Sequence, residues 1–110
     1  MTIYQSCLSE AANYTDRDAF VSDLSLSSIW EDDEAADIPA ARLEWLGQLW
    51  DAAHRSVKEI AAAAGLSQRK LAERFAIPYR TVENWCGGQR GCPVYVKMMM
   101  QECLELVQPK

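Results

Sequence analysis

The stretch that decides the fold runs from Gln68 to Cys86 and reads QRKLAERFAIPYRTVENWC. Counted from Gln68, apolar or small side chains occupy the fourth, fifth, eighth, tenth, fifteenth and eighteenth positions: Leu71, Ala72, Phe75, Ile77, Val82 and Trp85. Two short helices that cross steeply need a small residue in the first helix, a tight turn, and apolar anchors that hold the second helix. The spacing therefore predicts a helix-turn-helix whose second helix begins near Pro78.

The second helix of this motif carries a polar flank. The side chains in the gaps between its anchors are expected to project outward: Tyr79, Arg80, Glu83 and Asn84. Such a flank can meet another macromolecule, or it can be the solvated side of a helix pair that serves protein contact. The residues alone leave both interpretations open.

Residues that commonly begin or end helices punctuate the rest of the chain: Asp16, Pro39, Ser56, Gly65, Ser67, Pro78 and Gly87–Gly88. Ser56 has Glu59 three residues later, which is the spacing of a capping box. Asp16 and Ser67 are expected N-cap residues, and the glycines tolerate the left-handed conformation of a helix end. Each proline suits the start of a helix, where its missing N–H costs nothing.

Apolar side chains recur at helical spacing in three further segments. The first begins at Asp16 and reaches about Trp30, the second begins at Pro39, and the third runs from about Val94 to Val107. The second is expected to present one apolar face made of Leu43, Leu46, Leu49, Trp50 and Ala53. The third is expected to present Val96, Met99, Met100, Cys103, Leu104 and Val107. No alternating pattern suggests a strand, so the fold is expected to be all-α; residues 1–15 predict no element.

Charge divides the chain into an acidic front half and a basic back half. The whole chain of 110 residues has a net charge of −5. Residues 1–54 hold eleven acidic and two basic side chains, whereas residues 55–97 hold three acidic and eight basic ones. A basic region suits a polyanionic partner, because phosphate contacts need Lys and Arg. The segment from Glu31 to Asp37 is expected to be an acidic linker.

Several classes of protein are disfavoured by the sequence. No apolar stretch approaches the roughly 20 residues of a membrane span, and no secretory signal is visible, so we expect a cytoplasmic protein. The cysteines are then expected to be free thiols rather than a disulfide framework: Cys7, Cys86, Cys92 and Cys103. A regulatory disulfide between Cys86 and Cys92, or a metal site that adds Cys103 and His54, is a weaker alternative, since no CxxC pair exists. No nucleophile–base pair or phosphate loop appears, so we expect neither an enzyme nor a cofactor.

The motif resembles the lambda-repressor-like domains of the phage repressor and Cro family. The matching stretches are 65–68, 71–75 and 77–85, followed by residues 85–90 and Pro93, which look like the branch that includes antitoxins of toxin–antitoxin pairs. Resemblance covers residues 56–104, about half of the chain. Two departures are Ala76, where the family usually has Gly, and Pro78, where a Ser or Thr cap is common.

The resemblance implies a role for each polar residue of the motif. Side chains that would face base edges are Tyr79, Arg80, Glu83 and Asn84, because Arg can donate two bonds to guanine and Asn can pair two ways with adenine. Side chains that would contact the DNA backbone are Gln68, Arg69, Gln89 and Arg90. The fold would then be a lambda-repressor-like bundle over residues 39–107 with an acidic N-terminal helical extension over residues 1–38.

A second frame of the motif remains open. Residues 57–75 also scan as a helix-turn-helix, with apolar or small residues in most anchor positions, as in activators with an arabinose-regulator-like domain. That frame would make Gln68, Arg69 and Glu73 the reading face. Its eighteenth position falls on Arg74, where an apolar anchor is wanted, and it leaves the pattern from Ile77 to Trp85 unexplained.

Two functions follow as expectations. The first is a transcriptional regulator, acting as a repressor, that binds double-stranded DNA as a homodimer on two half-sites about one helical turn apart. The second is a protein-interaction module, such as an antitoxin that holds a toxin or another protein partner. Steep salt dependence of binding would separate the two, because phosphate contacts release counterions.

Overall fold

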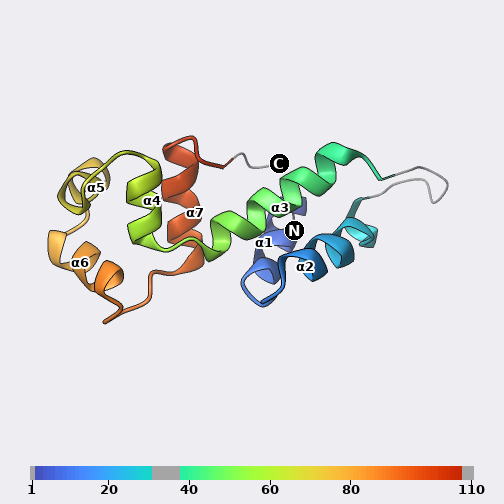
Figure 1. The fold of residues 1–110 in the computed structure, drawn as a ribbon, viewed down its shortest axis with the longest axis horizontal. Helices are drawn as coiled ribbons and strands as arrows, with labels where there is room; N and C mark the ends of the chain where they lie inside the picture. Colours follow the sequence, from blue (N-terminus) through green and yellow to red (C-terminus); the bar gives the residue numbers. More distant parts are fainter. Residues whose placement is uncertain (1, 31–37, 108–110) are drawn as a thin grey trace. The chain divides into compact units, whose positions relative to one another are not determined.

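The computed structural model describes residues 2–30 and 38–107, which form seven α-helices and one short 3₁₀ turn with no β-strand (Figure 1). The expected all-α fold is therefore confirmed. The contacts divide the chain into two compact units, an N-terminal unit up to His54 and a C-terminal unit from Arg55 onward. The sequence predicts a boundary near residue 38; the division falls later because the helix that starts at Ala40 packs against the helices before it. The expected linker, Glu31 to Asp37, lies outside the described residues.

The N-terminal unit consists of α1 (Ile3–Ala11), α2 (Arg17–Ser25), the 3₁₀ turn η1 (Ser28–Trp30) and α3 (Ala40–His54). Asp16 is the N-cap of α2, as predicted, and its carboxylate accepts from the backbone N–H of Asp18 at 2.9 Å. Helix α1 was not predicted. The sequence signal for this helix is a capping box, in which the side chains of Thr2 and Gln5 each accept from the other's backbone N–H. A capping box marks a helix N-terminus.

The buried face of α3 differs from the predicted one. Leu46, Leu49 and Ala53 are buried as expected, but Leu43 is 39% exposed. The inward position at that end of the helix belongs to Arg42, which is only 7% exposed. Its guanidinium lies 4.2 Å from the ring centre of Trp30 and donates to the backbone oxygen of Ser25 at 3.4 Å. An arginine with a long apolar stem can fill such a place when its charged end finds partners, and Leu43, about 100° away around the helix, then faces outward.

The C-terminal unit consists of α4 (Val57–Ala63), α5 (Gln68–Phe75), α6 (Tyr79–Gly87) and α7 (Val94–Cys103). Seven buried side chains from all four helices form its core: Val57, Ile60, Ala61, Leu71, Ala72, Val82 and Met100. The predicted caps are confirmed. Ser56 and Glu59 make both bonds of a capping box at 3.1 Å, and the Ser67 hydroxyl accepts from the N–H of Lys70 at 3.1 Å.

Each helix of the C-terminal unit ends on a residue with positive φ. Gly65 (φ +70°) and Gly88 (φ +81°) follow α4 and α6, as their positions in the sequence predicted. Ala76 (φ +53°) and Glu105 (φ +58°) do the same after α5 and α7, although both carry a Cβ. After α4, α5 and α7 the next N–H bonds the carbonyl five residues back, at 2.8–2.9 Å, so the helix-end carbonyls are paired.

Helix α7 is shorter than predicted. It ends at Cys103 rather than near Val107, because the left-handed Glu105 turns the chain and the N–H of Leu106 bonds the Gln101 carbonyl. Met99 was expected on the apolar face but is 61% exposed, and Cys103 is exposed as well. The side that faces the core carries Met100, with Val96 and Leu104 packed around it. None of the helices in the described ranges has the length and apolar character needed to cross a membrane.

Candidate nucleic-acid interface

Helices α5 and α6 are joined by a short turn, and the predicted anchors lie on their inner sides. Leu71, Ala72 and Val82 are buried in the core of the C-terminal unit, with at most 4% of their surface exposed. Phe75, Ile77 and Trp85 are partly buried and pack against the same core. All six side chains chosen by spacing therefore face inward. They fix the orientation of α6, since a helix with two inward anchors a turn apart has little freedom to rotate.

The turn between the two helices depends on Ala76. Its N–H donates to the Glu73 carbonyl at 3.3 Å, and the N–H of Ile77 donates to the Ala72 carbonyl at 2.9 Å. This pattern requires a left-handed residue, a role that glycine fills most easily. Ala76 adopts the left-handed conformation in spite of its Cβ, and the chain makes the tight turn that brings Pro78 to the start of α6.

The outward flank of α6 is polar. Arg80 and Glu83 are exposed, and Asn84 is half-buried. Tyr79 departs from the expectation, because its ring is half-buried against the core and the Arg69 guanidinium lies 4.2 Å from its centre. The Tyr79 hydroxyphenyl ring thus joins the first turn of α6 to the first turn of α5. Arg80, Glu83 and Asn84 remain the side chains best placed on α6 to meet a ligand.

The predicted backbone contacts lie at two places next to α6. Gln68 is the first residue of α5 and is half-buried, while Arg69 beside it is exposed. Gln89 and Arg90 follow the end of α6 and are both exposed. The Gln89 amide lies over Gly87. A Cβ at residue 87 would collide with this amide in its present position.

The N-terminus of α6 is open, a feature that the motif spacing did not predict. Pro78 was predicted at the first helical position, but it occupies the N-cap position, one residue before Tyr79. It has no side-chain group that could accept from the helix, and α6 has no side-chain cap bond. The first N–H groups of a helix carry partial positive charge and suit an anion. The absence of Ser or Thr at residue 78 was the signal in the sequence.

The cations of the C-terminal unit fall into two groups. Arg55 donates to the Gln101 amide oxygen at 2.6 Å, and Lys97 donates to the Arg55 backbone oxygen at 3.0 Å, so both are engaged inside the unit. Burial lowers the pKa of Lys97, which a nearby Glu59 partly opposes. Among residues 55–107, the exposed cations are Lys58, Arg69, Lys70, Arg74, Arg80 and Arg90. Most of them belong to α5, α6 and the loop after α6.

The competing frame, residues 57–75, corresponds to α4 and α5. Ile60, Ala61 and Leu71 are buried, as that frame also requires. Its last anchor position falls on Arg74, which is exposed. Moreover, Trp85 and Ile77 pack against the core, which only the frame of α5 and α6 explains. The burial pattern therefore favours α6 as the second helix of the motif.

The cysteines differ in how far they are buried. Cys7, Cys86, Cys92 and Cys103 are free thiols. Burial raises the pKa of Cys7 and of Cys92 to about 11, so neither is a ready nucleophile at neutral pH. Within residues 2–30 and 38–107, no three His, Cys, Asp or Glu side chains are grouped to hold a metal ion.

Comparisons with known proteins add no relative: no family model, curated protein or solved structure matches the chain.

Proposed function

We propose that the chain is a sequence-specific DNA-binding regulator that acts as a repressor and reads the major groove with α6. In this proposal Arg80, Glu83 and Asn84 meet base edges, and Tyr79 contributes its exposed edge at the start of the helix. The exposed Arg69, Gln89 and Arg90, with Gln68 at the N-terminus of α5, contact phosphates. The chain acts as a homodimer on two half-sites, and no catalytic step is assigned to it.

The single observation that carries the proposal is the division of α6 into two sides. One side is buried through Val82 and Trp85, and the other exposes Arg80 and Glu83. A helix held in this way can enter a groove without giving up its packing. The open N-terminus of α6 supports the proposal further, because phosphate can accept from N–H groups that no side chain caps.

Fluorescence anisotropy with duplexes selected from a random pool tests the proposal. A DNA reader loses affinity steeply as salt rises, because each phosphate contact releases counterions. Arg80→Ala is expected to cost about 1–3 kcal/mol against the selected sequence, and to relax the preference at one base position.

The matched control is Lys58→Ala, which removes the same charge from an exposed residue of α4, outside the proposed reading face. It is expected to weaken all duplexes slightly and equally. Binding that is insensitive to salt, or equal losses in the two variants on every sequence, would contradict the proposal. A module that only holds a protein partner would give that result.

A further inference from the structure

One face of α7 is apolar and yet exposed. Tyr95, Met99 and Cys103 are spaced four residues apart, so they lie on one side of the helix. Tyr95 is 65% exposed and Met99 is 61% exposed, the highest values for large apolar side chains in the described part of the C-terminal unit. Exposed apolar side chains gathered on one side of a helix can form a binding surface for another molecule.

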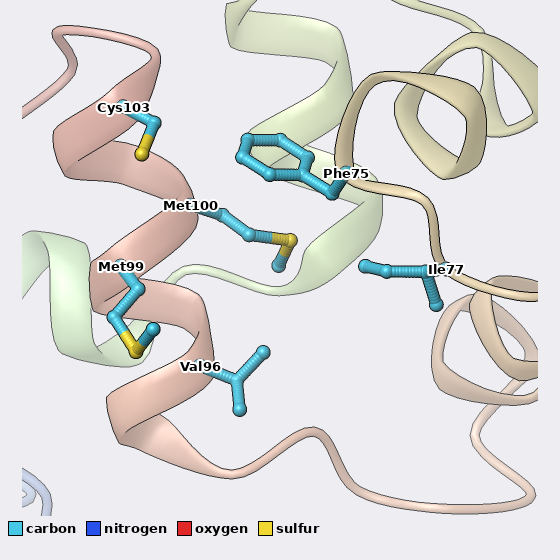
Figure 2. A pocket seen from close by; sticks show the side chains of 6 residues that line it. All are labelled: Phe75, Ile77, Val96, Met99, Met100 and Cys103. Carbon is cyan, nitrogen blue, oxygen red and sulfur yellow. The ribbon is translucent and has the colours of Figure 1, made fainter.

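A hollow of about 240 Å³ lies beside this row (Figure 2). Phe75 and Ile77, on either side of Ala76, line it from one side, and four residues of α7 line it from the other: Val96, Met99, Met100 and Cys103. None of these side chains is charged, and only the thiol has a polar hydrogen. Such a surface suits an apolar side chain rather than water, which needs two to four polar partners.

The protruding side chains and the hollow belong to the same patch, since Met99 both stands out from α7 and lines the hollow. Two identical copies related by a two-fold axis need one surface that is complementary to itself. We infer that the row Tyr95–Met99–Cys103 and the adjoining hollow, together called the α7 patch, form the contact through which two copies of the chain associate. Each copy places an exposed side chain of the row into the hollow of the other.

The charges at the rim of the α7 patch match this occupant. Arg74 is exposed, and its guanidinium lies 5.0 Å from the ring centre of Phe75, one of the lining residues. Glu102 is exposed and lines a second, shallow hollow with Met99 and Cys103. The rim thus holds both a cation and an anion. In a two-fold contact Arg74 of each copy pairs with Glu102 of the other, which a nucleic acid or an acidic partner could not satisfy.

This inference deepens the proposed function, because two half-sites on DNA require two copies of α6. The association itself needs no DNA and is tested without it. If the chain dimerises but binds no duplex, the proposed function fails and the inference stands. If it stays a monomer but binds a duplex sequence-specifically, the reading of DNA by α6 stands, whereas the inference and the homodimer of the proposed function fail.

Sedimentation equilibrium of the full chain over a range of concentrations gives the dimer dissociation constant. Met99→Glu is expected to raise that constant at least about tenfold, because a carboxylate from each copy would enter an apolar surface. Leu26→Glu is the matched control. It makes the same change at a 75% exposed side chain of the N-terminal unit and is expected to leave the constant unchanged.

A charge reversal tests the pairing independently of the apolar contact. Arg74→Glu and Glu102→Arg are each expected to weaken the dimer several-fold, and the double variant is expected to recover the original constant. All these residues are exposed, so unchanged melting curves at low concentration will show that each variant folds. Alkylation of the exposed Cys103 is expected to slow as the concentration of the chain rises.

Three results would overturn the inference. One is a monomer at every concentration. Another is a dimer that neither Met99→Glu nor the charge reversals affect, which would place the contact elsewhere. The third is a monomer in which Cys103 already resists alkylation, which would mean that a different occupant, such as a small apolar molecule, fills the α7 patch.

Discussion

The two units are both helical and similar in length, but they differ in how many cations they expose. Both arginines of the N-terminal unit serve internal contacts: Arg17 pairs with Asp51 at 2.9 Å, and Arg42 lies against Trp30. In the described part of the C-terminal unit, Arg55 and Lys97 make internal hydrogen bonds. The exposed cations Arg69, Lys70 and Arg74 contact neighbouring side chains, and Arg80 and Arg90 are exposed on α6 and in the loop after it. The position of the cations, more than the net charge of −5, therefore decides what the surface can bind.

The largest expected effect compares the two cores. Leu46 in α3 and Leu71 in α5 are both fully buried. Leu46→Ala and Leu71→Ala are each expected to lower the free energy of unfolding by about 2–5 kcal/mol, because each leaves a cavity among fixed neighbours. Urea titration followed by amide hydrogen exchange will show which helices lose protection in each variant. A cost below about 1 kcal/mol for either one would mean that its core is loosely packed.

The next effect concerns the capping box at the start of the C-terminal unit. Ser56→Ala is expected to cost about 1 kcal/mol, because the N–H of Glu59 loses its acceptor. The pKa of Glu59 is lowered, mainly by the hydrogen bond from the Ser56 backbone N–H and to a smaller degree by the Ser56 side chain. A carboxylate with a lowered pKa stabilises the folded state above its unfolded pKa, and the stabilisation is lost as the pH falls through the folded value.

Thermal melts at neutral and acidic pH will check this sign. The cost of Ser56→Ala is expected to shrink as the pH falls and Glu59 is protonated. The same substitution at Ser67, which caps α5 without a partnering carboxylate, is expected to show no such change. Equal pH dependence in both variants would show that the lowered pKa does not depend on the Ser56 hydroxyl and comes from the backbone N–H.

The next, smaller effect concerns the turn between α5 and α6. Ala76→Gly is expected to stabilise the chain by about 0.5–1 kcal/mol, because glycine adopts the left-handed conformation without strain. Gly65→Ala is the reciprocal control. Gly65 has the same helix-end hydrogen bonds, and a Cβ added there would meet no atom within 4 Å, so its cost reports backbone strain alone. Chemical denaturation will give both values, and opposite signs are expected.

The smallest effect lies on the surface of the N-terminal unit. Asp51→Asn removes one partner of the Arg17 ion pair, whose side chains are 45% and 42% exposed. We expect a loss of at most about 1 kcal/mol, and less in high salt, since exposed pairs are well solvated. A larger or salt-independent loss in urea titrations would show that Arg17 does more than pair with Asp51.

Features that depend on near neighbours in the chain could be predicted from residue types alone. The caps at Asp16, Ser56 and Ser67 and the stops at Gly65 and Gly88 involve residues within five positions of each other, so no distant partner is needed. The anchors of α5 and α6 followed from spacing, because helical geometry fixes which residues share a face. Helix α1 was missed although its capping box, Thr2 with Gln5, was visible in the sequence.

Features that depend on distant partners were settled only by the packing of the folded chain. Leu43 faces outward because Arg42 finds Trp30, and Tyr79 is half-buried because Arg69 and the core lie beside its ring. The exposure of Met99 and the division after His54 likewise follow from which surfaces meet. Periodicity shows that a helix has an apolar side, but only packing selects which of its apolar residues are covered, since burial depends on neighbours far away in the sequence.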